Sequence, residues 1–134
     1  MSWTLESLKS IFDKRDDWTT EIESGCLSIS NDENIDLFLY AGDNQLIVET
    51  PLFASGSVTD SASLNAVILR THQYQPLSTI GIKAIDGDDY YVAFGALSAN
   101  SNAEAVVEEV ETLFQNVDDF LELYESYITT ENNS

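Results

Sequence analysis

The feature that most constrains the fold of this chain is the spacing of apolar residues in its last third. Seven of them recur in alternating steps of four and three: Val106, Val110, Leu113, Val117, Phe120, Tyr124 and Tyr127. This spacing aligns their side chains along one face of an α-helix. Ser101 and Glu104 have the spacing of a capping box. We therefore predict a long amphipathic helix from residue 101 to about Ile128, packed over one face of a sheet.

The apolar face of this helix is wider than one sheet contact requires. A second line contains Val107, Phe114, Leu121 and Ile128, and Leu123 lies outside both lines. The helix therefore contacts the sheet and a second element, which is an earlier helix of the chain, a second copy or another protein. Our candidates for a protein-binding surface are Leu121, Leu123, Tyr124 and Ile128.

The preceding residues predict an antiparallel sheet and two more helices. Helical spacing indicates a helix over residues 3–14, capped by Ser2, and a second helix started by Thr59 or Asp60. We expect strands over residues 18–29, with a bulge at Gly25, and over 35–41, 46–54, 78–85 and 90–97. The predicted order is α-β-β-β-α-β-β-α, an α+β fold with a five-stranded antiparallel sheet, in one domain spanning residues 1–134.

The stretch AIDGDDYYVAF raises the question of a metal site, because Asp86, Asp88 and Asp89 surround Gly87. A calcium loop of the EF-hand type that began at Asp86 would need glycine at its sixth position and glutamate at its twelfth. Those positions hold Tyr91 and Leu97. Asp-Gly between two alternating apolar segments is instead typical of a hairpin turn. We predict a turn between two strands and no metal ligand.

Motifs that would indicate catalysis are also missing from the sequence. It has no G-x-S-x-G elbow, phosphate-binding glycine loop or H-x-x-x-H pair. Cys26 has no basic neighbour to activate it, and pairing with His72 has no support in the spacing. We expect no catalytic residue, metal or cofactor. The alternative is an enzyme or small-ligand binder with an unrecognised pocket near His72, Tyr90 and Tyr91.

The charge of the chain restricts its partners. Asp and Glu number 24 against 5 Lys and Arg, for a formal net charge of −19. Such a surface repels nucleic acids and anionic lipids, and it attracts basic segments. A nucleic-acid mimic is a further alternative, although the acids are scattered through turns and helix exteriors. One cysteine, no basic leader and no long apolar run lead us to expect a cytoplasmic protein without a membrane segment.

Several stretches together resemble the YjfI-like family of small bacterial cytoplasmic proteins: SWTLESLKSIF, IDLFLYAGDNQLIVETPLFA, LNAVILRTH, PLSTIGI and YYVAFGALSA. The resemblance covers nearly the whole chain and implies no catalytic residue. Family members often lie in neighbourhoods that encode phage-shock-protein-A-like membrane-stress proteins. The predicted element order also resembles the type III secretion chaperone fold, whose members are small, acidic, usually dimeric and bind protein segments.

These observations predict a non-enzymatic, acidic protein-binding module that is chaperone- or adaptor-like and connected with membrane stress. The expected partner carries a basic or amphipathic segment, and the chain itself is expected to form a homodimer.

Overall fold

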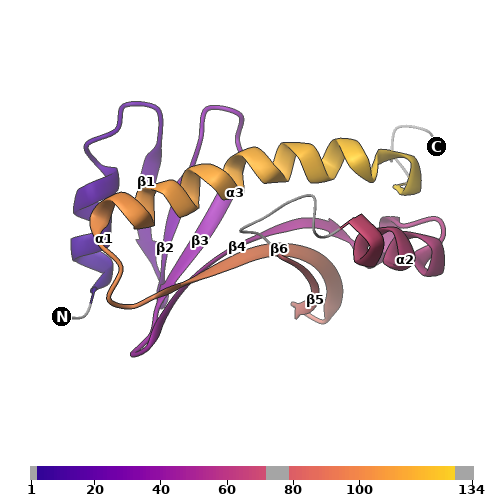
Figure 1. Cartoon of the computed structure of the whole chain (residues 1–134), viewed down its shortest axis with the longest axis horizontal. Helices are drawn as coiled ribbons and strands as arrows, with labels where there is room; N and C mark the ends of the chain where they lie inside the picture. The colour runs from indigo at the N-terminus through magenta and orange to yellow at the C-terminus, as the bar shows by residue number, and fades with distance from the viewer. Residues whose placement is uncertain (1–2, 72–78, 129–134) are drawn as a thin grey trace.

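An antiparallel sheet organises the part of the chain that the computed structural model describes, residues 3–71 and 79–128 (Figure 1). Its six strands lie in the order β1-β2-β3-β4-β6-β5. They are β1 (Thr19–Glu23), β2 (Cys26–Ser30), β3 (Asp36–Ala41), β4 (Gln45–Ala54), β5 (Thr79–Ile85) and β6 (Asp88–Ser98). The helices are α1 (Leu5–Phe12), α2 (Ser61–Thr71) and α3 (Ala103–Leu123), with short 3-10 turns η1 (Ser55–Ser57) and η3 (Glu125–Tyr127). The predicted α+β class and antiparallel sheet are confirmed.

The prediction of five strands is wrong, because residues 18–29 form a hairpin and not one bulged strand. Gly25 has a φ of 82°, in the left-handed region that glycine adopts without steric strain. The chain therefore reverses here, and Glu23 pairs with Cys26 on the returning strand. A glycine in a run of strand-forming residues is compatible with a bulge or a turn, and the alternation on either side does not distinguish them.

Two helix starts differ from the sequence prediction. Thr4 is the N-cap of α1, and its side chain accepts a hydrogen bond from the Ser7 N–H at 3.1 Å; the predicted cap, Ser2, lies outside the described residues. Asn102, not Ser101, is the N-cap of α3, and its Oδ1 accepts from the Ala105 N–H at 2.8 Å. Asn and Ser are equally good caps, so neighbouring candidates of this kind cannot be ranked by type.

Two other local predictions are confirmed. Asp60 caps α2, because its Oδ1 accepts a hydrogen bond from the Ser63 N–H at 3.1 Å. Asp86 and Gly87 form the turn of the β5–β6 hairpin, with φ angles of 51° and 89°, and Ile85 pairs with Asp88 across it. Positive φ at both central positions is typical of the tight turn that matches the twist of a hairpin.

The core lies between one face of the sheet and the helices α1 and α3. Six residues of the predicted stripe are at most 3 % exposed. Five of them lie on α3 and Tyr124 follows its end: Val106, Val110, Leu113, Val117, Phe120 and Tyr124. Opposite them lie alternate strand residues, among them Leu27, Leu39 and Val48, which share one register across three strands. Figure 1 shows α3 running across the strands, with α1 at one end and α2 at the other.

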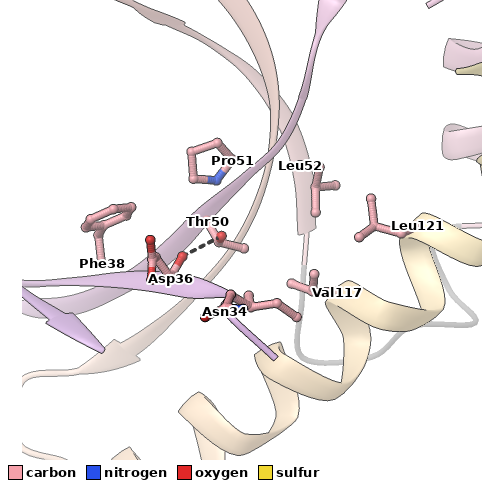
Figure 2. Close-up of a pocket in the computed structure, with 9 residues that line it drawn as sticks. Asn34, Asp36, Phe38, Thr50, Pro51, Leu52, Val117 and Leu121 are labelled. Carbon is pink, nitrogen blue, oxygen red and sulfur yellow. Dashed lines mark hydrogen bonds between the residues drawn. The ribbon is translucent and has the colours of Figure 1, made fainter. Parts of the chain in front are cut away.

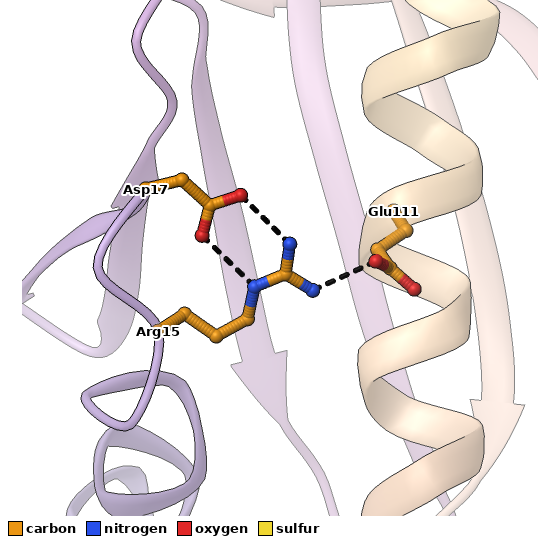
Figure 3. Close-up of polar contacts among 3 residues, drawn as sticks. All are labelled: Arg15, Asp17 and Glu111. Atoms are coloured by element: carbon orange, nitrogen blue, oxygen red, sulfur yellow. Dashed lines mark hydrogen bonds and ion pairs between the residues drawn. The ribbon is translucent and has the colours of Figure 1, made fainter.

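A charged cluster ties the segment before β1 to α3 (Figure 3). Arg15 donates from Nε and Nη2 to both carboxylate oxygens of Asp17, at 3.0 and 2.7 Å, and from Nη1 to Glu111 at 2.7 Å. Its guanidinium carbon also lies 3.9 Å from the centre of the Trp18 ring. These two carboxylates raise the pKa of Arg15. The cluster therefore links α3 to the segment that leads into the first hairpin.

Candidate functional site

The strongest candidate site is a groove between α3 and the start of β3, alongside the end of β4 (Figure 2). We call it the α3 groove. Its volume is about 360 Å³, and it is lined by Asn34, Ile35, Asp36, Phe38, Thr50, Pro51, Leu52, Val117 and Leu121. Figure 2 shows Leu52 and Leu121 facing one another across it. The groove therefore offers an apolar floor that a side chain of a partner can enter.

The strands explain why a groove forms at this place. β3 pairs with β4 only from Phe38 opposite Glu49 to Ala41 opposite Leu46, whereas β4 continues to Ala54. The register of β4 against β6 shifts between Pro51 and Phe53, as in a β-bulge. Thr50 Oγ1 donates to the Asp36 carbonyl at 2.7 Å and closes one end. The end of β4 is therefore left without β3 beside it, and α3 passes over the gap.

Acidic residues border the α3 groove. Asp36 lines it, while Glu33 and Asp118 directly neighbour the lining residues Asn34 and Val117. The Asp118 carboxylate raises the pKa of Glu33, with burial and the charge of Asp32 adding to the effect. The neighbouring carboxylates of Glu33 and Asp118 repel each other, and a cation that binds between them relieves this repulsion. The combination suits a partner segment with an apolar side chain and a neighbouring Lys or Arg.

The loop that carries this acidic border is held in shape by its own backbone contacts. Asn31 Oδ1 accepts hydrogen bonds from the N–H groups of Glu33 and Ile35, both at 3.0 Å. Asn34 has a φ of 64°, a left-handed conformation that asparagine tolerates better than most residues. The carboxylates of Asp32 and Glu33 are therefore presented at a fixed turn.

The predicted protein-binding residues do not form one surface. Leu121 lines the α3 groove. Leu123 is 42 % exposed, but it follows two positions later and so points to a different side of α3. Tyr124 is fully buried and stacked on Phe120 at 6.1 Å between ring centres. Ile128 is half-buried and pairs with Val58 in an isolated β-bridge. Tyr124 is thus part of the core, whereas Leu121 and Leu123 remain accessible on separate sides.

The alternative pocket at Tyr90 and Tyr91 does not assemble. Consecutive strand residues point to opposite faces of a sheet, so the two phenols are separated by β6 itself. Tyr91 is 2 % exposed, and its hydroxyl donates to Asn65 Oδ1 at 2.6 Å, which joins α2 to the sheet. His72, the third member of this alternative, lies outside the described residues.

A second hollow lies on the face of the sheet opposite α1 and α3. Its volume is about 420 Å³, and its polar lining includes Cys26, Tyr40, Glu49 and Lys83. Lys83 Nζ is 2.5 Å from Glu49 Oε2 and 5.5 Å from the centre of the Tyr40 ring. Burial raises the pKa of the Cys26 thiol, and the charges of Glu23 and Glu49 raise it further. A thiol with a raised pKa is a poor nucleophile, so the hollow does not have an activated cysteine.

The described residues hold neither a metal-binding cluster nor a membrane-spanning helix. They contain no group of three or more His, Cys, Asp or Glu side chains arranged to hold a metal ion. None of the helices in residues 3–71 and 79–128 is long and apolar enough to cross a membrane.

Sequence reasoning found Leu121 but missed the other lining residues of the α3 groove. The available signal was Pro51 within a strand pattern, because proline in a strand indicates an edge or a bulge. That signal places an irregularity at the end of β4. It does not reveal which helix passes over the gap.

Comparison with known proteins identifies relatives along nearly the whole chain. Residues 2–128 match the family described as "Uncharacterized protein conserved in bacteria (DUF2170)". The chain belongs to this family. It is 26 % identical over 131 residues to the uncharacterized protein YjfI of Escherichia coli K12, covering 95 % of this chain and 98 % of YjfI, and equally to YjfI of strain O157:H7. The resemblance to the YjfI-like family is confirmed.

Two solved structures share the fold. The crystal structure of YbjN from E. coli, provisionally assigned as a transcription regulator, superposes with a TM-score of 0.70 at 15 % identity, over 92 % of this chain and 94 % of that chain. A chain of the HopA1–SchA chaperone–effector complex superposes with a TM-score of 0.63 at 14 % identity, over 86 % and 90 %. This DUF2170 chain therefore has a fold found in a chaperone–effector complex, and at such identity the likeness concerns the fold alone.

Proposed function

We propose that this DUF2170 protein is a non-enzymatic, chaperone- or adaptor-like module that binds a basic or amphipathic segment of another protein in the α3 groove. The observation that carries the proposal is the apolar floor between Leu52 and Leu121. Asp36 is among the lining residues, and Glu33 and Asp118, which lie close to each other, follow or precede lining residues in the sequence. An apolar side chain of the partner enters the groove, and a Lys or Arg beside it binds the carboxylates.

The charge of the whole chain supports the same proposal. A net charge of −19 steers a basic segment toward the protein before any contact forms. The fold shared with a chaperone–effector complex is consistent with binding of protein segments. The family resemblance suggests a specific candidate, a phage-shock-protein-A-like membrane-stress protein, and we propose that the two proteins meet in the cytoplasm.

The test uses two leucines of α3 as a matched pair. Leu121→Asp and Leu123→Asp each place an acid at an accessible position of the same helix, but only Leu121 lines the groove. Binding of the host's purified phage-shock-protein-A-like protein is measured by calorimetry at low salt, with thermal melts to confirm folding. We expect Leu123→Asp to bind like the wild type and Leu121→Asp to bind at least tenfold more weakly.

A variant of the border separates charge from packing. Glu33→Gln combined with Asp118→Asn leaves the groove floor intact and removes two charges, and we expect several-fold weaker binding with a smaller dependence on salt. A wild type that does not bind this protein rejects the candidate partner. Equal binding by Leu121→Asp and Leu123→Asp would reject the groove.

Small-ligand binding is the second candidate function, and the hollow beside Lys83 favours it. Its volume of about 420 Å³ is in the range of ligand pockets, and it combines apolar walls with the Lys83–Glu49 ion pair. A screen of small carboxylic acids and amines by protein NMR tests it. Shifts centred on Tyr40 and Lys83 that Lys83→Met abolishes would support this function, and an unresponsive face would remove it.

A further inference from the structure

The two hollows described above share part of their lining. Phe38 and Pro51 line the α3 groove and also the hollow beside Lys83, which we call the sheet hollow. Their volumes are about 360 and 420 Å³, and each combines apolar walls with at least one carboxylate. The α3 groove and the sheet hollow therefore adjoin one another at Phe38 and Pro51, and one chain can occupy both.

The strand register shows which way the shared residues point. Phe38 lies opposite Glu49 on β4, and Pro51 follows two positions after Glu49. Paired residues and alternate residues share one face of a sheet, so these three side chains lie on the face opposite α3. In Figure 2, Phe38 and Pro51 point away from α3, whereas Leu52 faces Leu121. The path from the groove to the hollow therefore passes from the helix-bearing face to the other face near the start of β3.

The sheet hollow is formed by the curvature of the sheet. It is lined by Glu23 and Cys26 of the first hairpin and by Lys83 of β5. Three strands lie between β2 and β5, which would place those two strands roughly 19 Å apart in a flat sheet. Figure 1 shows β5 and β6 curving away from the direction of β2 and β3. Residues from both sides of the sheet therefore meet around one concave surface.

One carboxylate of the sheet hollow is compensated and another is not. Lys83 Nζ lies 2.5 Å from Glu49 Oε2. Glu23 takes part in none of the ion pairs found within residues 3–71 and 79–128. Burial raises the pKa of the Tyr40 phenol, and the charges of Glu49 and Glu23 raise it further, so the charge of Glu23 acts inside the hollow. A Lys or Arg that enters can therefore bind Glu23 and lie over the face of the Tyr40 ring.

A third carboxylate stands near the junction of the two hollows. Asp36 lines the α3 groove and lies two positions before Phe38, on the same face of β3. Ser30 Oγ donates to Asp36 Oδ1 at 2.5 Å and fixes the direction of this side chain. Glu33 and Asp118 are sequence neighbours of residues that line the groove. Carboxylates therefore accompany the path along its whole length.

Another exposed apolar surface of the chain lacks such acids. Leu69 of α2 is 76 % exposed and Ile82 of β5 is 55 % exposed, and both line a groove of about 290 Å³. α2 and β5 contain no Asp or Glu in a chain with 24 of them. Acids are thus not a property of every apolar surface of this chain. The occupant whose charge fits the path through Phe38 and Pro51 is a segment with more than one basic residue.

We infer that the partner segment binds in extended form along this whole path, with an apolar residue in the α3 groove and a Lys or Arg in the sheet hollow. The inference rests on the proposed function and deepens it, because it adds a second site and a spacing. Asp36 and Tyr40 are four positions apart on β3, or roughly 13 Å. An extended segment spans this distance in about four residues, and alternate side chains of such a segment share one side. Both side chains therefore face the protein.

The test uses two glutamates of β1 as a matched pair. Glu21 and Glu23 are both exposed and lie on the same face of the strand, but only Glu23 of the two lines the sheet hollow. Glu21→Lys and Glu23→Lys change the net charge equally. The probes are overlapping 15-residue peptides of the host's phage-shock-protein-A-like protein, and calorimetry at low salt measures their binding. For a peptide that binds, we expect Glu23→Lys to weaken binding about tenfold and Glu21→Lys by less than about threefold.

Changes in the peptide test the contact and its spacing. Replacing the Lys or Arg four positions from the apolar residue by Glu should weaken binding to the wild type and restore binding to Glu23→Lys. The same replacement at another basic residue should not restore it. A peptide shortened to exclude the fourth position should shift the NMR signals of Leu121 and not those of Tyr40, whereas the full peptide should shift both.

The outcomes separate this inference from the proposed function. Binding that Leu121→Asp weakens, but that Glu21→Lys and Glu23→Lys affect equally, would overturn the inference alone and leave the sheet hollow to a small ligand. Binding of the full partner protein but of no peptide would overturn the extended segment. A wild type that binds neither would reject the proposed function for this partner, and the extended path with it. Thermal melts establish that both lysine variants are folded.

Discussion

Two accessible apolar surfaces at different places on the sheet differ chiefly in the charges around them. Asp36 lines the α3 groove, and Glu33 and Asp118 are sequence neighbours of its lining residues, whereas α2 and β5 contain no acid. Both offer apolar side chains, so apolar character alone does not distinguish their partners. In a chain with 24 acidic residues, the absence of acid is as informative as its presence. The contrast favours a basic partner for the α3 groove and a partner that is not strongly basic for the surface of α2 and β5.

The largest expected change in stability comes from the buried residue that follows the end of α3. Tyr124→Ala should lower the free energy of unfolding by about 3–5 kcal/mol, because it removes a fully buried aromatic ring. Leu123→Ala, at a position that is 42 % exposed, should change it by less than about 1 kcal/mol. Urea unfolding followed by circular dichroism measures both. Similar losses for the two variants would show that Tyr124 is not a core residue.

Salt should affect self-association and binding of a basic partner in opposite directions. Raising the salt concentration from 50 to 500 mM screens repulsion between two copies that each carry a net charge of −19, so dimerisation should become about tenfold tighter. The same change should weaken binding of a basic segment by about tenfold. Sedimentation and calorimetry on the same preparations measure the two constants. If both constants move in the same direction, net charge does not govern the two kinds of association differently.

A buried acid outside both surfaces should cause a smaller change in stability. Glu109 on α3 is 5 % exposed, its Oε2 has no hydrogen-bond partner among the described residues, and burial and Glu108 raise its pKa. Because the pKa is higher in the folded chain, this group destabilises the fold as pH rises from about 4 through the raised value. Glu109→Gln should therefore stabilise the protein at pH 7 by about 1 kcal/mol.

The control for Glu109 is the pH series itself. The gain from Glu109→Gln should shrink as pH falls toward 4, where the wild-type carboxyl is also neutral. A gain that is equal at pH 4 and pH 7 would mean that it comes from packing and not from charge. Neither surface contains Glu109, so dimerisation and partner binding serve as unchanged references.

The smallest effect concerns the charged cluster at the first hairpin. Glu111→Gln removes one of the two carboxylates that bind Arg15, at a position where the glutamate side chain is 50 % exposed. Exposed ion pairs contribute little, so the loss of stability should be at most about 0.5 kcal/mol. Thermal unfolding checks this. A loss above 1 kcal/mol would show that the cluster holds α3 in place more strongly than its exposure indicates.

The fold could be predicted from the sequence wherever side-chain periodicity determined the structure. The stripe from Val106 to Tyr124 specified α3, and the Asp86–Gly87 dipeptide specified the last hairpin. Prediction failed where one residue type suits two conformations. Gly25 permits a bulge or a turn, and the choice between them changed the number of strands from five to six.

The sites were harder to predict, because they depend on which elements meet in space. Leu121 was singled out on its helix, but its neighbours Leu52 and Ile35 lie on segments distant in sequence. The exposure of Ile82 could not be predicted from the sequence either, because a strand with alternating isoleucines has the same pattern at an edge and at the centre of a sheet. Only the strand order reveals that β5 is the outermost strand on its side of the sheet.

The position of α3 has a consequence for how the protein is made. It follows the entire sheet in sequence, yet it supplies much of the apolar layer against which the strands pack, from Val106 to Phe120. During synthesis the strands leave the ribosome first, and their apolar face stays open to water until α3 has followed. We therefore expect a nascent chain that stops before Ala103 to lack a stable fold. The many carboxylates that emerge earlier keep such chains apart by mutual repulsion while they await the last helix.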